Sequence, residues 1–182
     1  MATYEAMVHL RHAREADARA IADVHVRTWQ HAYRDILPPD YLQALSVDAR
    51  ARYWATELRV LPPERRPWLA EAGQEVVGFV SVGPCRDEGM APSTGEIYAL
   101  YVVPEFWARG VGRNLLLRAE RELIQHGYAD ATLWLLSGND RARAFYEAAG
   151  WKADGGVKQD RIGDREVSEV RYRRVLERSR VG

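Results

Sequence analysis

The stretch Gly95–Arg121, GEIYALYVVPEFWARGVGRNLLLRAER, decides the fold. It predicts a buried strand from Ile97 to Val103, a turn at Pro104, and a glycine-containing bend that leads into an amphipathic helix. The helix has apolar residues at three- and four-residue spacing, which we expect to pack on a sheet: Leu115, Leu116, Ala119 and Leu123. Three arginines on its other side are expected to be exposed: Arg113, Arg118 and Arg121.

A strand followed by a glycine bend and a helix N-terminus is suited to binding phosphate. Main-chain N–H groups point outward there, the helix dipole adds partial positive charge, and glycine allows close approach to the main chain. The bend, with Gly110 and Gly112, is not a nucleoside triphosphate loop, because no Gly-x-x-x-x-Gly-Lys-Ser/Thr run is present. A dinucleotide fingerprint needs a third glycine, and Leu115 stands at that position.

A second motif, NDRARAFYEAAGW, spans Asn139–Trp151. It predicts a helix from Asp140 to Ala149 with an Asn139 cap at its start and Gly150 at its end. Asn139, Arg143 and Tyr146 then follow one side of the helix over two turns. An amide and a phenol on one line suit a ligand whose amide-bearing arm ends in sulfur, and pantetheine is such an arm.

Together the two motifs resemble those of the GNAT-type N-acetyltransferase superfamily. The loop Trp107-Ala108-Arg109-Gly110-Val111-Gly112-Arg113 is similar to the family's Arg/Gln-x-x-Gly-x-Gly/Ala loop, with Trp107 in place of the usual Arg or Gln. The second run is similar to the family's Asn-x-x-Ala-x-x-Phe-Tyr-x-x-x-Gly-Trp/Phe signature. The resemblance implies an α/β, single-domain GNAT-like fold. Its central mixed, mostly antiparallel twisted sheet would have about six to seven strands, flanked by about four helices.

The resemblance also implies acetyl-CoA as the acyl donor and a set of residues that contact it. These are Leu100, Tyr101, Val102, Trp107, Ala108, Arg109, Gly110, Val111, Gly112, Arg113, Asn139, Arg143 and Tyr146. Tyr146 is expected to be the general acid, because a phenol can protonate a departing thiolate. Glu96 is the leading candidate for the general base, with His25 and His31 as alternates. The acceptor would enter near the first two helices, where four side chains are candidates for shaping the pocket: Trp29, His31, Tyr33 and Tyr41.

The expected reaction is transfer of an acetyl group from acetyl-CoA to a primary amine of a small molecule or peptide, by direct attack in a ternary complex. A non-catalytic acyl-CoA-binding sensor or regulatory module is the alternative. Cys85 offers a covalent route, but no nucleophile motif accompanies it, and an ordinary structural thiol fits better.

Composition limits the partners. The chain has 182 residues, and 26 Lys plus Arg balance 26 Asp plus Glu, so no nucleic acid or membrane partner is expected. We expect one domain over 1–182, with a cofactor half at 95–151 and acceptor-side helices at 14–60. A single cysteine and the lack of a long apolar run favour a cytoplasmic protein. No metal-ligand spacing is present, so no metal is expected. A homodimer through the C-terminal strands is compatible with the sequence.

Periodicity and turn residues predict the remaining elements. A first strand is expected at Val8–Leu10, then helices at 16–33 and 40–58, the second opened by Pro38-Pro39. Strands are expected at 68–71 and 75–82, joined at Gly73, and at 131–136. Gly78 suggests a bulge or a close backbone approach. Two further strands are expected around the Ile162-Gly163-Asp164 turn.

Overall fold

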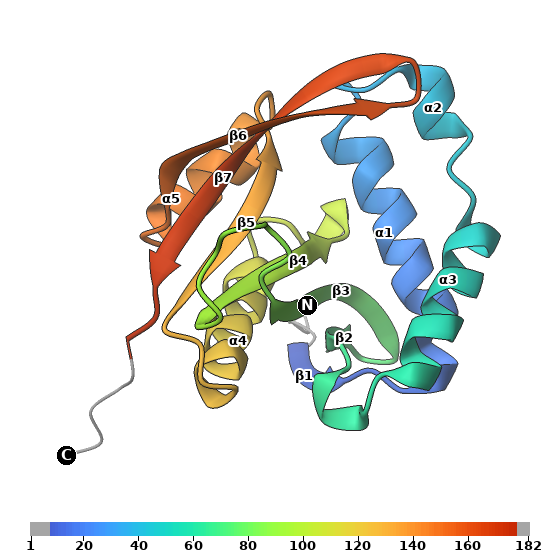
Figure 1. Ribbon diagram of the computed structural model, residues 1–182. Helices are drawn as coiled ribbons and strands as arrows, with labels where there is room; N and C mark the ends of the chain where they lie inside the picture. Colours follow the sequence, from blue (N-terminus) through green and yellow to red (C-terminus); the bar gives the residue numbers. More distant parts are fainter. Residues whose placement is uncertain (1–7, 178–182) are drawn as a thin grey trace. The chain divides into compact units, whose positions relative to one another are not determined.

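The computed structural model describes residues 8–177, which form seven strands and five α-helices (Figure 1). In chain order the elements are β1 (Val8–His12), α1 (Ala18–Ala32), α2 (Pro39–Gln43), α3 (Val47–Val60), β2 (Trp68–Ala72), β3 (Glu75–Pro84), β4 (Thr94–Val102), α4 (Val111–Gln125), β5 (Asp130–Leu136), α5 (Asp140–Ala148), β6 (Lys152–Ile162) and β7 (Arg165–Val175).

All seven strands belong to one mixed sheet in the order β1-β2-β3-β4-β5-β7-β6. The pairs β1/β2, β2/β3, β5/β7 and β6/β7 are antiparallel, and β4/β5 is parallel. The expected α/β fold with a mostly antiparallel mixed sheet is therefore confirmed. The parallel ladder is short: it pairs Thr94–Glu96 with residues 130–132, and within the described chain it extends no further along β4.

The described residues divide into two compact units. The first consists of residues 8–28, Ser46–Ser81 and Ala99–Arg118; the second consists of Trp29–Leu45, Val82–Tyr98 and residues 119–177. Each unit has its own buried residues. Ile21, Leu69 and Phe79 are fully buried in the first, as are Leu123 and Ala131 in the second.

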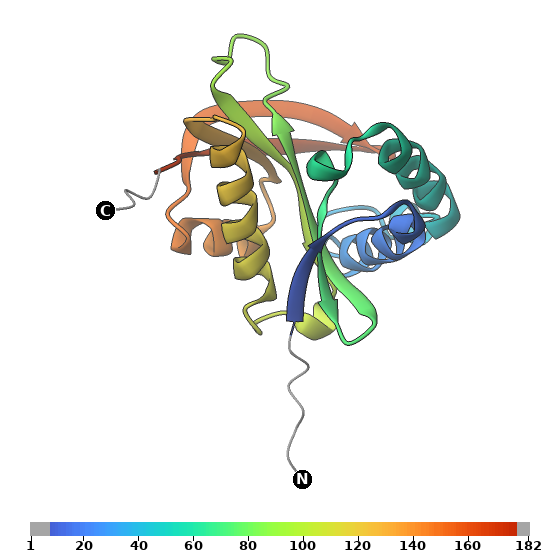
Figure 2. The same ribbon diagram turned by 90° about the horizontal axis from the view of Figure 1, so that it is seen from below.

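In the first unit, the ladder between β2 and β3 has an irregularity opposite Ala70 and Glu71, where the register skips Val77. The expectation for Gly78 is confirmed on both counts. The bulge lies next to it, and a Cβ at this position would lie 2.9 Å from the Tyr101 carbonyl oxygen. In the same unit, the first part of α1 lies beside α3 (Figure 2), and Arg19 pairs with Asp48 there.

The prediction of a single helix at 40–58 is wrong, because two helices occupy this stretch. α2 begins at Pro39, as the two prolines predicted, and ends at Gln43. Ser46 adopts an extended conformation and its side chain accepts a hydrogen bond from the Ala49 N–H, so it caps a new helix, α3. A serine N-cap competes with helix continuation because its side chain replaces a main-chain acceptor.

The second unit holds the long β6–β7 hairpin, whose tip lies beside α2 (Figure 1). The contact is close: a Cβ on Gly163, at the hairpin turn, would lie 3.0 Å from the Tyr41 ring. A cluster of four buried residues joins α2, β5 and β7: Leu37, Leu42, Leu136 and Val167. The two strands expected around this turn are confirmed, with eleven residues each.

The helix after the glycine bend has the expected face. Leu115, Leu116, Ala119 and Leu123 are at most 2% exposed. Arg113 and Arg121 are exposed as predicted, whereas the Arg118 guanidinium lies 3.7 Å from the centroid of the Trp68 ring. The guanidinium of this arginine therefore covers an aromatic ring instead of extending into solvent.

Candidate active site

The loop between β4 and α4 has an unusual backbone. Ala108 has a φ of 57°, and it is the only non-glycine residue in the described chain with a positive φ. Gly110 has a φ of 81°. Two left-handed residues this close together turn the chain sharply, and residues 108–110 are exposed.

The amides of this loop are available to a ligand. None of the main-chain hydrogen bonds found in residues 8–177 is donated by the N–H groups of residues 108–113. The first bonded amide of α4 is that of Asn114, which donates to the Gly110 carbonyl at 3.0 Å. Six consecutive donors at the start of a fifteen-residue helix, next to a left-handed turn, form a site with the chemistry of a phosphate cradle.

Trp107 anchors the start of the loop. Its indole Nε1 donates a 2.6 Å hydrogen bond to the Val102 carbonyl at the end of β4. The same carbonyl accepts from the Thr28 hydroxyl at 3.2 Å. At this position the indole therefore binds the protein's own main chain. The role of Trp107 as an anchor was not predicted, because its partner is a carbonyl rather than a recognisable side chain.

Within the described residues, β4 pairs with β5 only as far as Glu96. From residue 97 onward, the edge of β4 that faces β5 is therefore outside this ladder. The Val103 N–H donates to the Val77 carbonyl in β3, so Val103 faces that neighbour. Successive residues of a strand present their main-chain groups to opposite edges. Val102 and Leu100 therefore present theirs to the other edge, while Tyr101 packs its ring against Phe79 at a centroid distance of 5.5 Å.

Two arginines flank the cradle. Arg109 and Arg113 are both exposed, and the Arg109 guanidinium lies 5.3 Å from the centroid of the Phe106 ring. They flank Gly110 in the sequence, and their charges reinforce the partial positive charge of the amides in this loop.

The second motif forms the helix that was predicted. The Asn139 side chain accepts from the Ala142 N–H at 3.1 Å, which confirms the cap, and Gly150 has a φ of 85° just after the helix. Arg143 pairs with Asp140 at 2.8 Å. Tyr146 is 6% exposed, and its ring contacts those of Phe145 and Trp151. Asn139 is thus the N-cap of α5, and Arg143 and Tyr146 lie within this helix.

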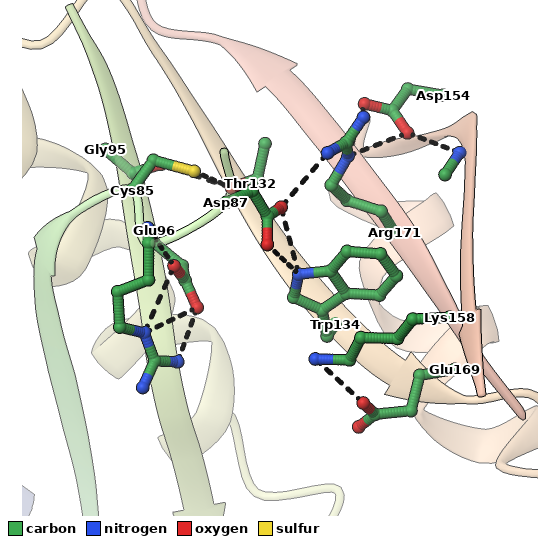
Figure 3. Close-up of polar contacts among 12 residues, drawn as sticks. Cys85, Asp87, Gly95, Glu96, Thr132, Trp134, Asp154, Lys158, Glu169 and Arg171 are labelled. Carbon is green, nitrogen blue, oxygen red and sulfur yellow. Dashed lines mark hydrogen bonds and ion pairs between the residues drawn. The ribbon is translucent and has the colours of Figure 1, made fainter. Parts of the chain in front are cut away.

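Glu96 is 2% exposed, and both of its carboxylate oxygens accept hydrogen bonds from Arg86. In Figure 3 these are the dashed lines that meet at the labelled Glu96. The Arg86 Nη2 lies 2.5 Å from Oε1, and the Arg86 main-chain N–H donates to Oε2 at 2.9 Å. The Arg86 guanidinium also lies 4.2 Å from the centroid of the Tyr98 ring. Burial, and then the charge of Glu96, raise the pKa of Tyr98 to about 12. Arg86 was missed in the sequence because its partner is ten residues away, across a loop.

The two histidines proposed as alternate bases differ in their surroundings. Burial, followed by the nearby charge of Arg50, lowers the pKa of His25 to about 3, so this imidazole is neutral at ordinary pH. Its ring lies 5.1 Å from that of Tyr101. His31, near the end of α1, is exposed.

Three of the four candidate acceptor-pocket residues lie together. Trp29, Tyr33 and Tyr41 pack on the cluster of Leu37, Leu42, Leu136 and Val167, and the Trp29 and Tyr33 rings meet edge to face at 5.1 Å. His31 is not part of this packing set.

Cys85 lies near a strand end, where its Sγ is 3.5 Å from the Thr132 hydroxyl. Across residues 8–177, no group of three or more His, Cys, Asp or Glu side chains is placed to hold a metal ion. Over the same residues, no helix is both long and apolar enough to cross a lipid bilayer.

Comparison with known proteins gives the same family as the two motifs. The model of the Acetyltransferase (GNAT) family matches residues 20–151. The uncharacterized N-acetyltransferase YuaI of Bacillus subtilis is 35% identical over 143 residues, which cover 78% of this chain and 79% of the relative. A probable N-acetyltransferase of Mycobacterium tuberculosis is 32% identical over 151 residues, with 81% of this chain and 82% of the relative covered.

Solved structures share the fold at low sequence identity. The PaiA N-acetyltransferase of Thermoplasma acidophilum, in complex with coenzyme A, superposes with a TM-score of 0.70 at 19% identity, covering 92% of this chain and 98% of that one. A putative acetyltransferase of Salmonella typhimurium with acetyl-CoA gives a TM-score of 0.70 at 20% identity, covering 96% and 97%. The chain belongs to the GNAT acetyltransferase family. It is an N-acetyltransferase, an acyl-transferring enzyme.

Proposed function

We propose that this enzyme transfers the acetyl group of acetyl-CoA to a primary amine of a small-molecule or peptide acceptor, by direct attack while both substrates are bound. One observation carries the proposal: the exposed, left-handed loop whose six consecutive amides donate no main-chain hydrogen bond to any of the residues 8–177. Diphosphate is the ligand that such a cradle suits, and coenzyme A carries one.

The residues present fit acetyl-CoA at several points. The amides of residues 108–113 would hold the diphosphate, with Arg109 and Arg113 adding charge. Past its ladder with β5, the edge of β4 offers the main-chain groups of Leu100 and the N–H of Val102 to the amides of the pantetheine arm. The Val102 carbonyl already accepts from Trp107 and Thr28. Tyr101, Asn139 and Arg143 complete the proposed set, together with Trp107 as the anchor of the loop.

When bound, acetyl-CoA supplies a thioester whose carbonyl carbon is open to attack by an amine. The chain must then manage three proton transfers. A base takes a proton from the acceptor ammonium group, and an acid gives one to the sulfur as the thioester bond breaks and the amide bond forms. The second proton that the attacking nitrogen loses restores the acid. We assign the acid to Tyr146, because a phenol of pKa about 10 can protonate a thiolate whose conjugate acid has a pKa of about 8.5.

Glu96 is the proposed base. Its burial and its hydrogen bonds from Arg86 mean that the carboxylate acts only when the guanidinium moves aside or when a water relays the proton. Arg86 lies in the segment after β3, and its side chain is 65% exposed, so a swing into solvent breaks its hydrogen bonds to Glu96 and its stacking on the Tyr98 ring. The aromatic residues Trp29, Tyr33 and Tyr41, with His31 nearby, would shape the acceptor pocket.

Tyr146→Phe tests the acid. The variant keeps the ring contacts with Phe145 and Trp151 and loses only the hydroxyl, so we expect kcat to fall by about 10²–10⁴-fold with the Kd for acetyl-CoA unchanged. Tyr172→Phe is the matched control, since it removes the hydroxyl of another buried tyrosine, one that donates to Glu147 at 2.8 Å. Equal turnover in the two variants would show that Tyr146 is not the general acid.

A coenzyme A release assay against a panel of primary amines tests the function itself. Release that depends on an amine supports acetyl transfer. Calorimetric binding of acetyl-CoA with no release for any amine would instead indicate a sensor module. A cytoplasmic location, supported by the single cysteine, and a homodimer through the C-terminal strands remain part of the proposal. Fractionation of cells and light scattering of the purified protein check them.

A further inference from the structure

A half-buried tryptophan, Trp134 in β5, is held rigidly on the face that β5 shares with β7. Its indole Nε1 donates to both carboxylate oxygens of Asp87, at 3.1 and 3.2 Å (Figure 3). Arg171, the register partner of Trp134, bonds Asp87 at 3.0 Å and Asp154 at 2.9 Å. This chain of contacts fixes the orientation of the ring, because each link is a charge-assisted hydrogen bond.

A primary ammonium group lies on this ring. The Lys158 Nζ is 4.3 Å from the centroid of the Trp134 ring and 2.9 Å from the Glu169 carboxylate. An aromatic face next to a carboxylate is a good receptor for an alkylammonium ion, since both attract its charge. The site therefore already binds the functional group that an amine substrate carries.

The occupant is more exposed than its receptor. The Lys158 side chain is 44% exposed, whereas that of Glu169 is 19% exposed. Lysine carries a compact charge on a flexible four-carbon stem, so it can leave without disturbing the anchored ring. Of the 26 Lys plus Arg residues in the chain, only Lys152 and Lys158 are lysines. The nearby guanidinium of Arg171 is held by two carboxylates and is not the group that would be displaced.

The location suits an acceptor. Glu96, the proposed base, is the register partner of Thr132 in β5. Trp134 is two residues further along the same face, about 7 Å away along the strand. Leu136 follows on this face, where it belongs to the cluster that Trp29, Tyr33 and Tyr41 cover. The ammonium receptor thus lies between the proposed base and the proposed acceptor pocket, all within the second unit.

We propose that Trp134 and Glu169 bind a second ammonium group of the acceptor, and that Lys158 occupies their site until the acceptor arrives. The acceptor is then an aliphatic amine with two cationic nitrogens separated by a short methylene chain. A free carboxylate on the acceptor would meet Glu169 and Asp87, so amino acids are poor occupants of this subsite. The inference rests on the proposed transfer of acetyl to an amine.

The displacement of Lys158 is directly measurable. The chain has two lysines, so labelling with isotopic lysine should give NMR signals from these two residues. We expect the ring of Trp134 to shift the signals of the Lys158 ε-methylene upfield, because Nζ lies 4.3 Å from its centroid. We expect cadaverine to move the Lys158 signals to the unshifted position and to leave those of Lys152 in place. The monoamine n-pentylamine, of the same carbon chain length, should leave Lys152 in place and move the Lys158 signals only at higher concentration, because the subsite and the reacting end compete for its single ammonium group. Lys158 signals that stay shifted at saturating cadaverine would overturn the proposal.

Variants provide a second readout, the Kd for cadaverine by calorimetry. Lys158→Met removes the competitor, so binding should tighten about three- to tenfold, as the usual strength of an exposed ion pair and cation–π contact implies. Lys152→Met is the matched control on β6 and should have no effect. Glu169→Gln should weaken binding about tenfold. An identical Kd in Lys158→Met and Lys152→Met would also reject the subsite.

The same samples separate this inference from the proposed function. Release of coenzyme A with n-pentylamine and cadaverine at equal kcat/KM, without a response of Lys158, would reject the subsite and leave acetyl transfer standing. Movement of Lys158 by cadaverine without coenzyme A release for any amine would support the subsite and reject acetyl transfer.

Discussion

Gly110→Ala changes the backbone conformation of the phosphate cradle and keeps all of its N–H donors. Gly110 has a φ of 81°, where an L-residue carries a strain of about 1–2 kcal/mol. No heavy atom lies within 4 Å of the Cβ that alanine would add, so steric overlap contributes nothing. Because the loop is exposed at this residue, the free variant can relax to a negative φ, and the ligand must then restore the strained form.

The strain therefore appears in binding. A cost of about 1–2 kcal/mol corresponds to an increase of roughly 5- to 30-fold in the Kd for acetyl-CoA. Isothermal titration calorimetry measures it. Gly127→Ala is a matched control, since Gly127 has a φ of 88° and equally open surroundings but follows the far end of α4. A Kd for Gly110→Ala within twofold of that for Gly127→Ala would refute the role of this backbone in ligand binding.

Three further changes test other parts of the account. Glu96→Gln keeps an oxygen acceptor for Arg86 and removes the base, so the acidic limb of the kcat/KM profile should vanish; a retained limb would assign the proton to another group. Burial lowers the pKa of His25 to about 3 in the folded protein, against about 6.5 in the unfolded chain. Between these two pH values the unfolded chain therefore binds one more proton than the folded protein. The free energy of unfolding then falls as pH drops through this window, by up to about 1.4 kcal/mol per pH unit. Urea melts at graded pH should show that His25→Asn loses this slope, and an unchanged slope would contradict a neutral buried imidazole. Gly78→Ala places a Cβ 2.9 Å from the Tyr101 carbonyl oxygen and should cost about 1–3 kcal/mol, seen as a lower denaturant midpoint; a wild-type midpoint would mean that β3 and β4 lie further apart.

Local chemistry made much of the fold predictable. The Asn139 cap, the Gly150 stop and the Pro39 start are each decided by the residue's own side chain or φ preference, and each was confirmed. Ser46 shows the limit. It is as good a cap as Asn139, but the apolar periodicity of the residues around it also fits one continuous helix, and the hydrogen bond to the Ala49 N–H decides between the two.

The candidate site was predictable where it depends on the backbone. Gly110 and the helix that follows indicated a phosphate cradle from sequence alone, and the left-handed φ of Gly110 agrees with it. The contacts of Arg86, Asp87 and Lys158 were not predictable. Each joins residues from different strands or loops, and the spacing of charges along a chain does not determine which pairs meet across a sheet.

The central claim, that the amides of residues 108–113 bind the diphosphate of acetyl-CoA, is tested most directly by amide NMR. Assigned backbone N–H signals are followed while acetyl-CoA, and separately S-acetylpantetheine, which lacks the diphosphate, are added. The account predicts large downfield shifts of the 108–113 amides with acetyl-CoA and none with S-acetylpantetheine. Amides of 108–113 that stay in place while acetyl-CoA saturates the protein would contradict it.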